Sequence, residues 1–336
     1  LYHESNYTLG RWRFTAGLRF DFEHARLRYR NYTDTWYTKT RIKDDAVYEL
    51  QLEIDDRSTL KQTFTELLPK FSVMYSFDET RNLYLTIAKG YKSGGFNTQI
   101  FSDVLQQKMM NRMGIGEVYD VQRGVAYKPE YSWNYELGGH FSCMDGAVRG
   151  DFALFYIDCR DQQLTIFPEG TTTGRMMTNA GRTRSFGGEA SLLATLWRNL
   201  DLQVAYGYTR ATFVKFDTGK ADYAGNFIPY APQHTLYAGA SYTLRTSWNW
   251  LEYVIFRVAA NGAGRIYWNE ANTFSQPFYA LLEASIRFEH RHWAVDVWGR
   301  NLTDTPYDTF YFMSIGNSFL QRGRPRTFGV SLSITL

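Results

Sequence analysis

Cysteine, proline and long apolar runs are all scarce in this sequence of 336 residues, which contains 2 cysteines and 8 prolines. Cys143 and Cys159 flank a turn predicted at Asp145-Gly146, where antiparallel pairing would set Cys143 opposite a residue near position 148 and far from Cys159. We therefore expect two unpaired thiols and no disulfide framework. Apolar runs of roughly eighteen residues are absent, which excludes a transmembrane helix.

The sequence also lacks a large excess of either positive or negative charge. The net charge is only +3, which is too small to indicate nucleic acid as a partner. No histidine lies near a cysteine or carboxylate at a spacing typical of a metal site, and no Ser/His/Asp or Cys/His arrangement indicates catalysis. The sequence therefore predicts neither an enzyme nor a resident cofactor.

What the sequence does contain is strict alternation of apolar and polar residues over unusually long segments. In residues 11–23, "RWRFTAGLRFDFE", the even positions from Trp12 to Phe22 are apolar or small, and most odd positions are polar. This period of two predicts a strand with one apolar and one polar face. We count about twelve such runs, and most reach the 9–11 residues that a membrane-spanning strand needs.

The connections between these runs alternate in length. Short turns are predicted at 77–82, 144–147, 197–201, 245–249 and 289–292. Longer loops are predicted at 31–60, 97–129, 167–173, 217–230, 269–276 and 304–321. Short turns at one end and long loops at the other are typical of an outer-membrane β-barrel, with the turns periplasmic and the loops extracellular.

Aromatic residues collect at both ends of the predicted strands, as expected for girdles at the two membrane interfaces. The alternative is that they fill the core of a soluble protein. The short-turn end has Trp197, Trp248, Trp250 and Trp293, and the loop end has Tyr91, Phe96, Tyr131, Trp133, Phe213, Phe216, Tyr267, Trp268 and Phe278.

The number of predicted strands indicates how their sheet can close into a barrel. The first strand, near residues 8–29, and the last, which ends at the C-terminus, both have an end on the short-turn side, so the number of strands is even. Such a sheet closes by itself or forms the later part of a larger barrel, because open edges are not viable in lipid.

Four segments, in order along the chain, resemble TonB-dependent outer-membrane receptors, especially those for ferric siderophores. They are "YLTIAKGYKSGGFN" at 84–97, "KPEYSWNYELGG" at 128–139, "NAGRTRSFGGEASL" at 179–192, and "WGRNLTDTPY" at 298–307 with "RGRPRTFGVSLSITL" at 322–336. Each match is loose alone, but four in order are fairly specific. Family members usually end on an aromatic residue, whereas this sequence ends at Leu336.

The resemblance implies an all-β fold, an antiparallel transmembrane barrel of 22 strands whose lumen holds an N-terminal plug domain. Residues 1–336 have room for about twelve of these strands, so we expect them to be the C-terminal portion of the barrel, without the plug and early strands. By itself this portion should form a curved antiparallel sheet with two exposed edges.

The resemblance also implies a function in the outer membrane of a Gram-negative bacterium. The whole protein would bind a scarce, bulky ligand, most simply a ferric siderophore, and import it with energy from the TonB complex, which contacts the N-terminal part. Its partners would be TonB, the plug, outer-membrane lipid and the ligand. Haem, cobalamin or an oligosaccharide are alternative ligands, and a passive pore or adhesin-like barrel is the alternative function.

Candidate ligand contacts are aromatic and basic residues in loops and lumen, which suit an amphiphilic anionic ligand. They are Tyr91, Lys92, Phe96, Arg123, Tyr127, Arg182 and Arg184. Further arginines are predicted to face a plug from the polar side of the wall, where they attract acidic groups. They are Arg11, Arg13, Arg19 and Arg324. The alternative is that they are interface anchors or solvated charges.

Two segments invite other interpretations. "GYKSGGFN" resembles a phosphate-binding loop, but its lysine precedes the glycines and no helical pattern follows. We instead expect Gly94-Gly95 to mark the point where a strand bends into a loop, since glycine permits the positive φ or bulged geometry needed there. Asp44, Asp45, Asp55 and Asp56 could bind calcium, but they lack EF-hand spacing, which favours a solvated loop.

Overall fold

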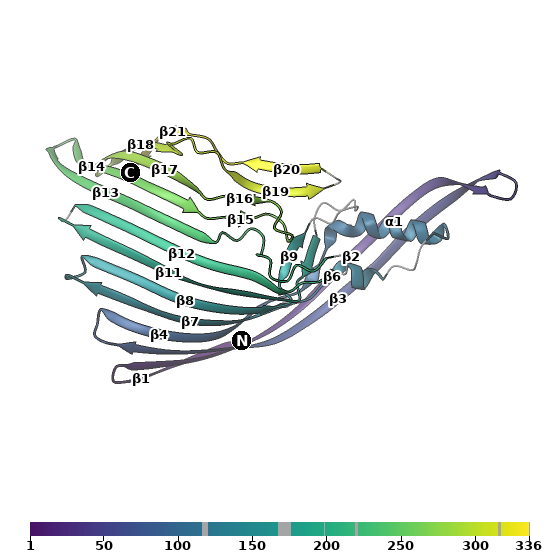
Figure 1. Cartoon of the computed structure of the whole chain (residues 1–336), viewed down its shortest axis with the longest axis horizontal. Coiled ribbons are helices and arrows are strands. Elements are labelled where there is room, and N and C mark those ends of the chain that lie inside the picture. The colour runs from purple at the N-terminus through teal and green to yellow at the C-terminus, as the bar shows by residue number, and fades with distance from the viewer. Residues whose placement is uncertain (116–119, 167–175, 198, 219–220, 315–316, 336) are drawn as a thin grey trace.

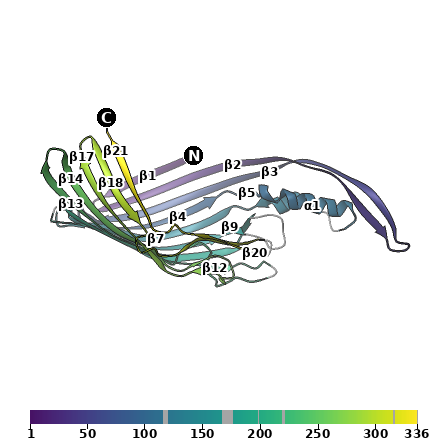
Figure 2. The same ribbon diagram turned by 90° about the horizontal axis from the view of Figure 1, so that it is seen from above.

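The computed structural model describes residues 1–115, 120–166, 176–197, 199–218, 221–314 and 317–335. Its main feature is a thirteen-stranded antiparallel sheet that curves into part of a barrel wall (Figures 1 and 2). In spatial order the strands are β1 (Tyr2–Leu9), β2 (Trp12–Arg41), β3 (Ala46–Ser76), β4 (Arg81–Lys92), β7 (Glu130–Cys143), β8 (Val148–Arg160), β11 (Arg182–Leu196), β12 (Leu200–Lys215), β13 (His234–Trp248), β14 (Leu251–Ala263), β17 (Tyr279–His290), β18 (Trp293–Arg300) and β21 (Thr327–Ile334).

The remaining elements lie in the loops at one end of this sheet. They are β5 (Gly95–Phe96), η1 (Thr98–Ile100), α1 (Phe101–Arg112), α2 (Val121–Val125), β6 (Ala126–Tyr127), β9 (Gln163–Ile166), β10 (Met176–Asn179), β15 (Ile266–Tyr267), β16 (Ser275–Gln276), β19 (Asp308–Ser314) and β20 (Asn317–Arg322). None of the described helices is long and apolar enough to cross a membrane.

The predicted curved wall with two open edges is confirmed, since β1 and β21 each have one partner in the described sheet. The predicted first strand at 8–29 was wrong, because the chain turns at Gly10 and Arg11. Residues Tyr2–Leu9 form a separate strand, paired from Leu9↔Trp12 to Tyr2↔Arg19. This extra strand makes the sheet odd in number.

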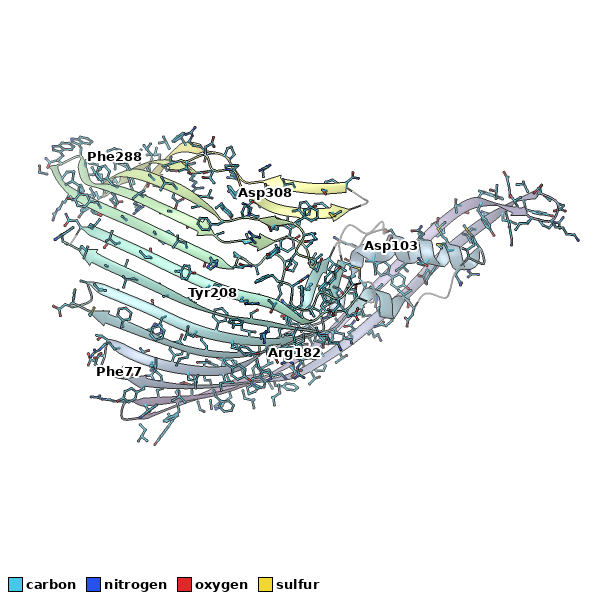
Figure 3. All side chains as sticks on the ribbon, in the orientation of Figure 1. Phe77, Asp103, Arg182, Tyr208, Phe288 and Asp308 are labelled. Atoms are coloured by element: carbon cyan, nitrogen blue, oxygen red, sulfur yellow. The ribbon has the colours of Figure 1, made fainter. Side chains whose placement is uncertain are left out.

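The five short turns lie at one end of the sheet, where Phe77 and Phe288 are found, and Arg182 and Asp103 lie at the opposite end (Figure 3). Four of the five turns are shorter than predicted because the strands extend into them. For example, β13 extends to Trp248, which stacks on Trp250 with ring centroids 5.3 Å apart. Cys143 lies opposite Val148 as predicted, and both cysteines are free.

The predicted loop 31–60 is instead a hairpin. β2 and β3 pair without interruption from Trp12↔Tyr75 to Arg41↔Ala46, and they project far beyond their neighbours (Figure 1). Beside them β4 stops pairing with β3 at Lys70↔Ala88. We call the part of the hairpin beyond the sheet, residues 24–63, the hairpin extension. The predicted loop 167–173 lies outside the described residues.

The two faces of this hairpin exchange polarity along its length. Below residue 24 the even positions of β2 are apolar and the odd ones largely polar. Above it, Leu27 and Tyr29 at odd positions pack with Leu60 of β3 beneath the loop helices. Arg26 and Arg28, at even positions, are exposed. The ladder has no register shift, so the side chains, not the backbone, make the exchange.

The apolar face corresponds to lipid. From Trp12 to Phe22 the ladder rises about 33 Å at roughly 3.3 Å per residue. A strand tilted by about 40° covers about 25 Å of height over that length, which matches the apolar band of an outer-membrane barrel. On β11 the same face is apolar or small from Leu196 to Phe186 and then carries Arg184. The upper boundary of the band therefore lies near Phe22 on β2 and near Phe186 on β11.

Candidate functional site

The polar face of the sheet is its concave face. Leu27 and Tyr29 lie on the same side of β2 as Arg13 and Arg19, and they contact the cluster that includes Val104 of α1. Figure 2 shows α1 lying along the concave side of β2 and β3. The lumen of the wall is therefore lined by the polar positions, as the alternation predicts.

Acidic and hydroxyl groups join into a network on this face. The hydroxyl of Tyr84 donates to Glu136 Oε1 at 2.8 Å. His140 of β7 forms a hydrogen bond through Nδ1 with Asp151 of β8. The other carboxylate oxygen of Asp151 accepts a hydrogen bond from Ser191 Oγ of β11 at 3.0 Å. Because Ser191 bonds the carboxylate and not the imidazole, this trio lacks the nucleophile–base contact of a hydrolase.

Two hollows mark the concave face. One is lined in part by Tyr84, His140, Asp151, Glu189, Asn261 and Tyr279, and the other in part by Asp201, Gln203, Arg257, Glu283, Asp296 and Arg300. Sequence reasoning singled out arginines and missed these acids, although "NYELGGH" at 134–140 carries the same alternation signal. The face offers both signs of charge to whatever fills the lumen.

The four plug-facing arginines are not equivalent. Arg13 and Arg19 lie on the concave side, and Arg19 Nε is 2.7 Å from Asp21 Oδ1 while its side chain stays 63% exposed. Arg11 lies in the turn between β1 and β2. Arg324 lies between β20 and β21, where its carbonyl accepts from Asn301 Nδ2 at 3.1 Å. The structure therefore places two of the four on the face for which they were predicted.

The stretch "AKGYKSGGFN" is a junction between loops. Gln163 Nε2 donates to the carbonyls of Ser93 at 2.7 Å and Lys128 at 3.2 Å. The buried Asn97 side chain accepts from Met177 N at 2.7 Å and donates to Met177 O at 2.9 Å. These side-chain amides satisfy backbone groups that no ladder reaches, so they fix the base of three loops together.

Gly94 and Gly95 are required for close approach and not for a left-handed turn, since neither has a positive φ. A Cβ on Gly94 would lie 2.4 Å from the carbonyl oxygen of Tyr127, and one on Gly95 would lie 2.4 Å from the Tyr127 hydroxyl. The strand ends at Lys92 as predicted, but of the expected alternatives the positive φ was wrong. β5 and β6 pair here because the glycines leave room for Tyr127.

The prediction that no helix follows these glycines was also wrong. η1 and α1 follow directly, and Ile100, Val104 and Val125 are buried against Leu60 of the hairpin extension. Asn31 Nδ2 donates to Phe101 O at 3.2 Å, and Lys108 forms an ion pair with Asp56. The described part of the predicted loop 97–129 is thus a helical cap fixed on the concave side; we call residues 93–115 and 120–129 the loop cap. Asn97 lies between the glycines and the helix, so no phosphate cradle forms.

Of the predicted ligand contacts, four lie at this junction. Tyr91 packs on Tyr131 with ring centroids 5.8 Å apart, and Lys92 is exposed opposite Glu130. Phe96 packs against the cluster beneath the loop cap, and Tyr127 lies against Gly95. Arg123 belongs to α2, but its side chain is outside the part of the structure that is described.

Arg182 and Arg184 lie elsewhere than predicted. They alternate in register with Phe186, whose partner Tyr156 is on the apolar face, so both belong to the lipid-facing side just above the apolar band. Arg182 Nε pairs with Asp158 Oδ1 at 2.7 Å. Alternation alone predicts the wrong face for them, because a charged side chain above the apolar band can face outward into water and need not face the lumen.

Three of the four carboxylates considered for calcium form ion pairs with cations. Asp44 pairs with Arg41 at the hairpin tip, Asp55 pairs with Arg30 and Arg57, and Asp56 pairs with Lys108. The two arginines hold the pKa of Asp55 well below its usual range, Arg57 more than Arg30. Within the described ranges no group of three or more His, Cys, Asp or Glu could hold a metal.

A second set of loops packs around aromatic residues. Phe213 and Phe216 are 1% and 6% exposed and form one cluster with Ile228, while Trp268 joins Ile266 and Tyr311 in another. Phe213, Phe216 and Trp268 were predicted to form an interfacial girdle, but they are buried in clusters beneath the loops. Burial raises the pKa of the Glu270 carboxyl beside them, and it raises the pKa of Tyr230 to about 12.

Known proteins resemble this chain in sequence and in fold. The family described as "TonB dependent receptor-like, beta-barrel" matches residues 1–302. The pesticin receptor of Yersinia enterocolitica serotype O:8 is 26% identical over 280 residues, covering 82% of this chain and 37% of that protein. The crystal structure of the ferric yersiniabactin uptake receptor FyuA from Yersinia pestis matches with a TM-score of 0.72 and 21% identity, covering 99% of this chain and 44% of that one.

The chain belongs to the TonB-dependent receptor β-barrel family, whose members are receptors and transporters of the Gram-negative outer membrane and not enzymes. Its fold is shared with the unliganded ferric citrate transporter FecA, with a TM-score of 0.64 and 19% identity, and with the copper transporter OprC, at 0.66 and 14%. The chain spans less than half the length of these relatives, and their cargoes differ, so fold alone does not name a ligand.

Proposed function

We propose that this chain is the C-terminal part of the barrel of a receptor that takes up a ferric siderophore across the outer membrane. The loop cap carries the proposal, because it is packed on the concave side at the extracellular end with Lys92, Phe96 and Tyr127 at its base. The relatives named as a pesticin receptor and a ferric yersiniabactin uptake receptor support the ligand class. The plug and the earlier strands would come from the rest of the protein.

The proposed ligand contacts are Lys92, Phe96 and Tyr127 at the base of the loop cap, with Arg123 on α2. Tyr91 is not among them, because it is in register with Tyr131 and Arg182 and therefore lies on the lipid-facing side. An aromatic and cationic surface suits an amphiphilic anionic chelate, since rings bury its apolar parts and cations attract its charge. Arg13 and Arg19, with the acids of the two hollows, would face the plug. Energy would reach the plug from the TonB complex, because no nucleotide is available at the outer membrane.

The test uses the full-length receptor in a strain that lacks its own copy. Uptake of a radioiron-labelled siderophore should depend on the receptor and stop when the inner-membrane proton gradient is dissipated. Uptake that continues without the gradient would establish a passive pore instead. Haem, cobalamin and an oligosaccharide serve as competing cargoes, and preference for any of them over every ferric siderophore would overturn the ligand class.

Asn97→Ala tests the loop cap specifically. It removes both side-chain bonds to Met177 and should lower ligand affinity about tenfold or more, while the barrel remains assembled. Asn6→Ala on β1 is the control, because it also removes a side-chain hydrogen bond, 2.6 Å long, but lies far from the loops. Equal affinity in both variants would show that the loop cap does not form the site.

A further inference from the structure

The β2–β3 hairpin has an open backbone edge on the side of β1. Leu1 N donates to Phe20 O at 3.0 Å, and Phe20 N donates to Leu1 O at 2.7 Å. In an antiparallel ladder such a pair directs both backbone groups of each residue toward the other strand, and the next residue directs them to the opposite side. The even positions of β2 therefore face the β1 side, and the odd positions face β3. Figure 2 shows β2 continuing beyond the N-terminal end of β1, and no described strand pairs with the β1 side of β2 above Phe20.

The open edge begins inside the membrane. Its lowest even position is Phe22, near the upper boundary of the apolar band, where lipid offers no hydrogen bond to the outward N–H and C=O groups. From Phe22 to Thr40 the edge continues for about 60 Å at roughly 3.3 Å per residue. The ladder with β3 has no register shift over this length, and β2 contains no proline. A long, flat edge of this kind is a template for another strand.

The other edge of the hairpin, on β3, is protected in two ways. Odd positions of β2 lie opposite even positions of β3, so the odd positions of β3 face β4. Pro69 is one of them and has no N–H for the next pair, so the ladder with β4 stops at Lys70↔Ala88. Beyond that point the loop cap lies beside β3, where Gln62 Nε2 donates to Gly95 O at 3.3 Å. Among the described residues, the β2 edge has neither kind of protection.

Side chains next to the open edge carry unmatched positive charge. Arg26 and Arg28 are exposed at even positions, and Arg26 lies opposite Lys61 of β3. Like charges directly opposite destabilise an antiparallel pair. Arg30, at the next even position, pairs with Asp55 at 2.9 Å, whereas no carboxylate in the part of the chain that the structure describes forms an ion pair with the other three residues. A strand on the β1 side would therefore be stabilised by acidic residues opposite these arginines.

We propose that the segment leading into β1 in the full-length receptor runs down the open edge of β2, from above Arg28 past Phe22, and makes the hairpin extension three-stranded. The pair Leu1↔Phe20 sets the register, so the sixth residue before Leu1 lies opposite Arg26 and the eighth lies opposite Arg28. We expect at least one of these two residues to be acidic, and two basic residues there would contradict the pairing. An edge that starts within lipid favours the receptor's own segment over a strand of another protein. The inference rests on the proposal that the chain is part of a larger barrel, and not on the cargo.

A third strand has a consequence for the loop cap. An isolated two-stranded hairpin is marginally stable in water, whereas three strands with an apolar face are stable. The loop cap packs on the inner face of the hairpin extension, where Val104 of α1 and Leu60 share one buried cluster. The added strand would therefore keep the support of the loop cap rigid without contacting the ligand.

Residue-resolved hydrogen exchange on the folded full-length receptor tests the pairing. The amides of Arg26 and Arg28 face the proposed strand, whereas those of Leu27 and Tyr29 face β3. With the third strand in place, the two sets should have protection factors within about tenfold of each other. On a bare edge the arginine amides should exchange at least about a hundredfold faster than their neighbours, in strict alternation, and this result would overturn the proposal.

Thr15 and Ala16 provide the reference for full pairing, because their amides face β3 and β1 and both are paired. Slow exchange at these two residues shows that the wall is assembled, so fast exchange at Arg26 and Arg28 in the same sample would mean that only the third strand is missing. The exchange pattern does not depend on the imported cargo. Failure of the siderophore assay and failure of this inference are therefore separate results.

A disulfide trap tests the register, in a background with Cys143→Ser and Cys159→Ser. A cysteine at the eighth residue before Leu1 should cross-link to Arg28→Cys, because residues directly opposite have Cα atoms about 5.5 Å apart, which a disulfide can span. A cysteine at the seventh residue is the matched control, since it projects from the other face of the strand and should not cross-link to the same position. No cross-link at the eighth residue, or equal yields at both, would overturn the proposed register.

Discussion

Gly94 illustrates how a single atom sets the geometry of the loop junction. A Cβ there would lie 2.4 Å from a backbone oxygen and 2.9 Å from the ring of Phe64. Neither β4 nor β6 can move without breaking its ladder. Glycine is thus needed at this position because the Tyr127 carbonyl and the Phe64 ring leave no room for a side chain. Local secondary-structure propensity cannot predict such a requirement.

Gly94→Ala should separate β5 from β6 and destabilise the junction by about 1–3 kcal/mol. Hydrogen exchange at the amides of 93–97 and 126–130 should rise measurably. Gly95→Ala should have a smaller effect, because its nearest contact is the movable end of the Tyr127 ring. Gly17→Ala is the matched control, with its nearest neighbour at an ordinary 3.5 Å, and a comparable loss there would contradict the explanation.

Glu270 is a carboxyl whose protonation matters to the loops around Trp268. Burial raises its pKa in the folded state, whereas an unfolded glutamate titrates near pH 4.3. Between those two pKa values the folded state binds more protons than the unfolded one. The stability of these loops should therefore decline as the pH rises through that window and remain reduced above it.

Glu270→Gln removes this dependence and should increase amide protection at Phe227, whose N–H is bonded to Asn272 Oδ1 at 2.7 Å. The gain should be present at pH 7 and shrink toward pH 4 after correction for intrinsic exchange. Glu79→Gln, at an exposed short turn, should show no such change. Protection that stays the same at pH 7 would show that burial of Glu270 has no energetic consequence.

At the scale of elements, the sequence predicts most of the wall and little of its loops. Alternation locates the membrane strands because lipid demands an apolar residue at every second position. It fails over 31–60 because the apolar residues of β2 move from the even to the odd positions at residue 24. A search for apolar residues at the even positions therefore ends the strand too early. It fails at α1 because "FSDVLQQKMMNR" has no single apolar stripe and begins without a capping side chain.

The candidate site, too, was predictable from the sequence only in part. The polar face was predictable, since Arg13, Arg19, Glu136 and His140 all alternate with apolar neighbours. The junction was not, because Asn97, Gln163 and Met177 are distant in sequence and meet only through loop packing. Arg182 and Arg184 were misplaced because a charged residue above the band can face outward without touching lipid.

The loop cap and the hairpin extension should stabilise each other. Leu60→Ala removes a side chain that is only 5% exposed beneath α1, and such a change costs about 2–5 kcal/mol. Limited proteolysis should then cut within 101–112 well before the wild type is cut. Glu53→Ala lies on the same strand but on the outer face and should leave cleavage unchanged. If both variants resist protease equally, α1 does not depend on this contact.

At the scale of the whole molecule, the open edges determine how the wall can exist in a membrane. The outer sides of β1 and β21 have no partner in the described sheet. Unsatisfied backbone groups are costly in lipid, so we expect further strands to complete the wall. This is consistent with a chain that covers 44% of the FyuA structure.

Residues 1–336 expressed alone should therefore not form a heat-modifiable monomer in detergent, whereas the full-length receptor should. Electrophoresis of unheated and boiled samples distinguishes the two, and cross-linking should reveal edge-to-edge oligomers of the isolated wall. A folded, monomeric isolated wall with a heat-dependent shift would show that these strands close without others.

The exchange of polarity at residue 24 also constrains how this hairpin can vary in evolution. Inserting one residue into β2 at that point would turn every side chain above it to the other face, putting Leu27 into water and Arg28 under the helices. Inserting two, with two more in β3, would keep both faces and lengthen the hairpin extension by about 6.6 Å along its strands. Length differences among relatives should thus come in even steps, and the reach of the receptor above the cell surface should change in discrete increments.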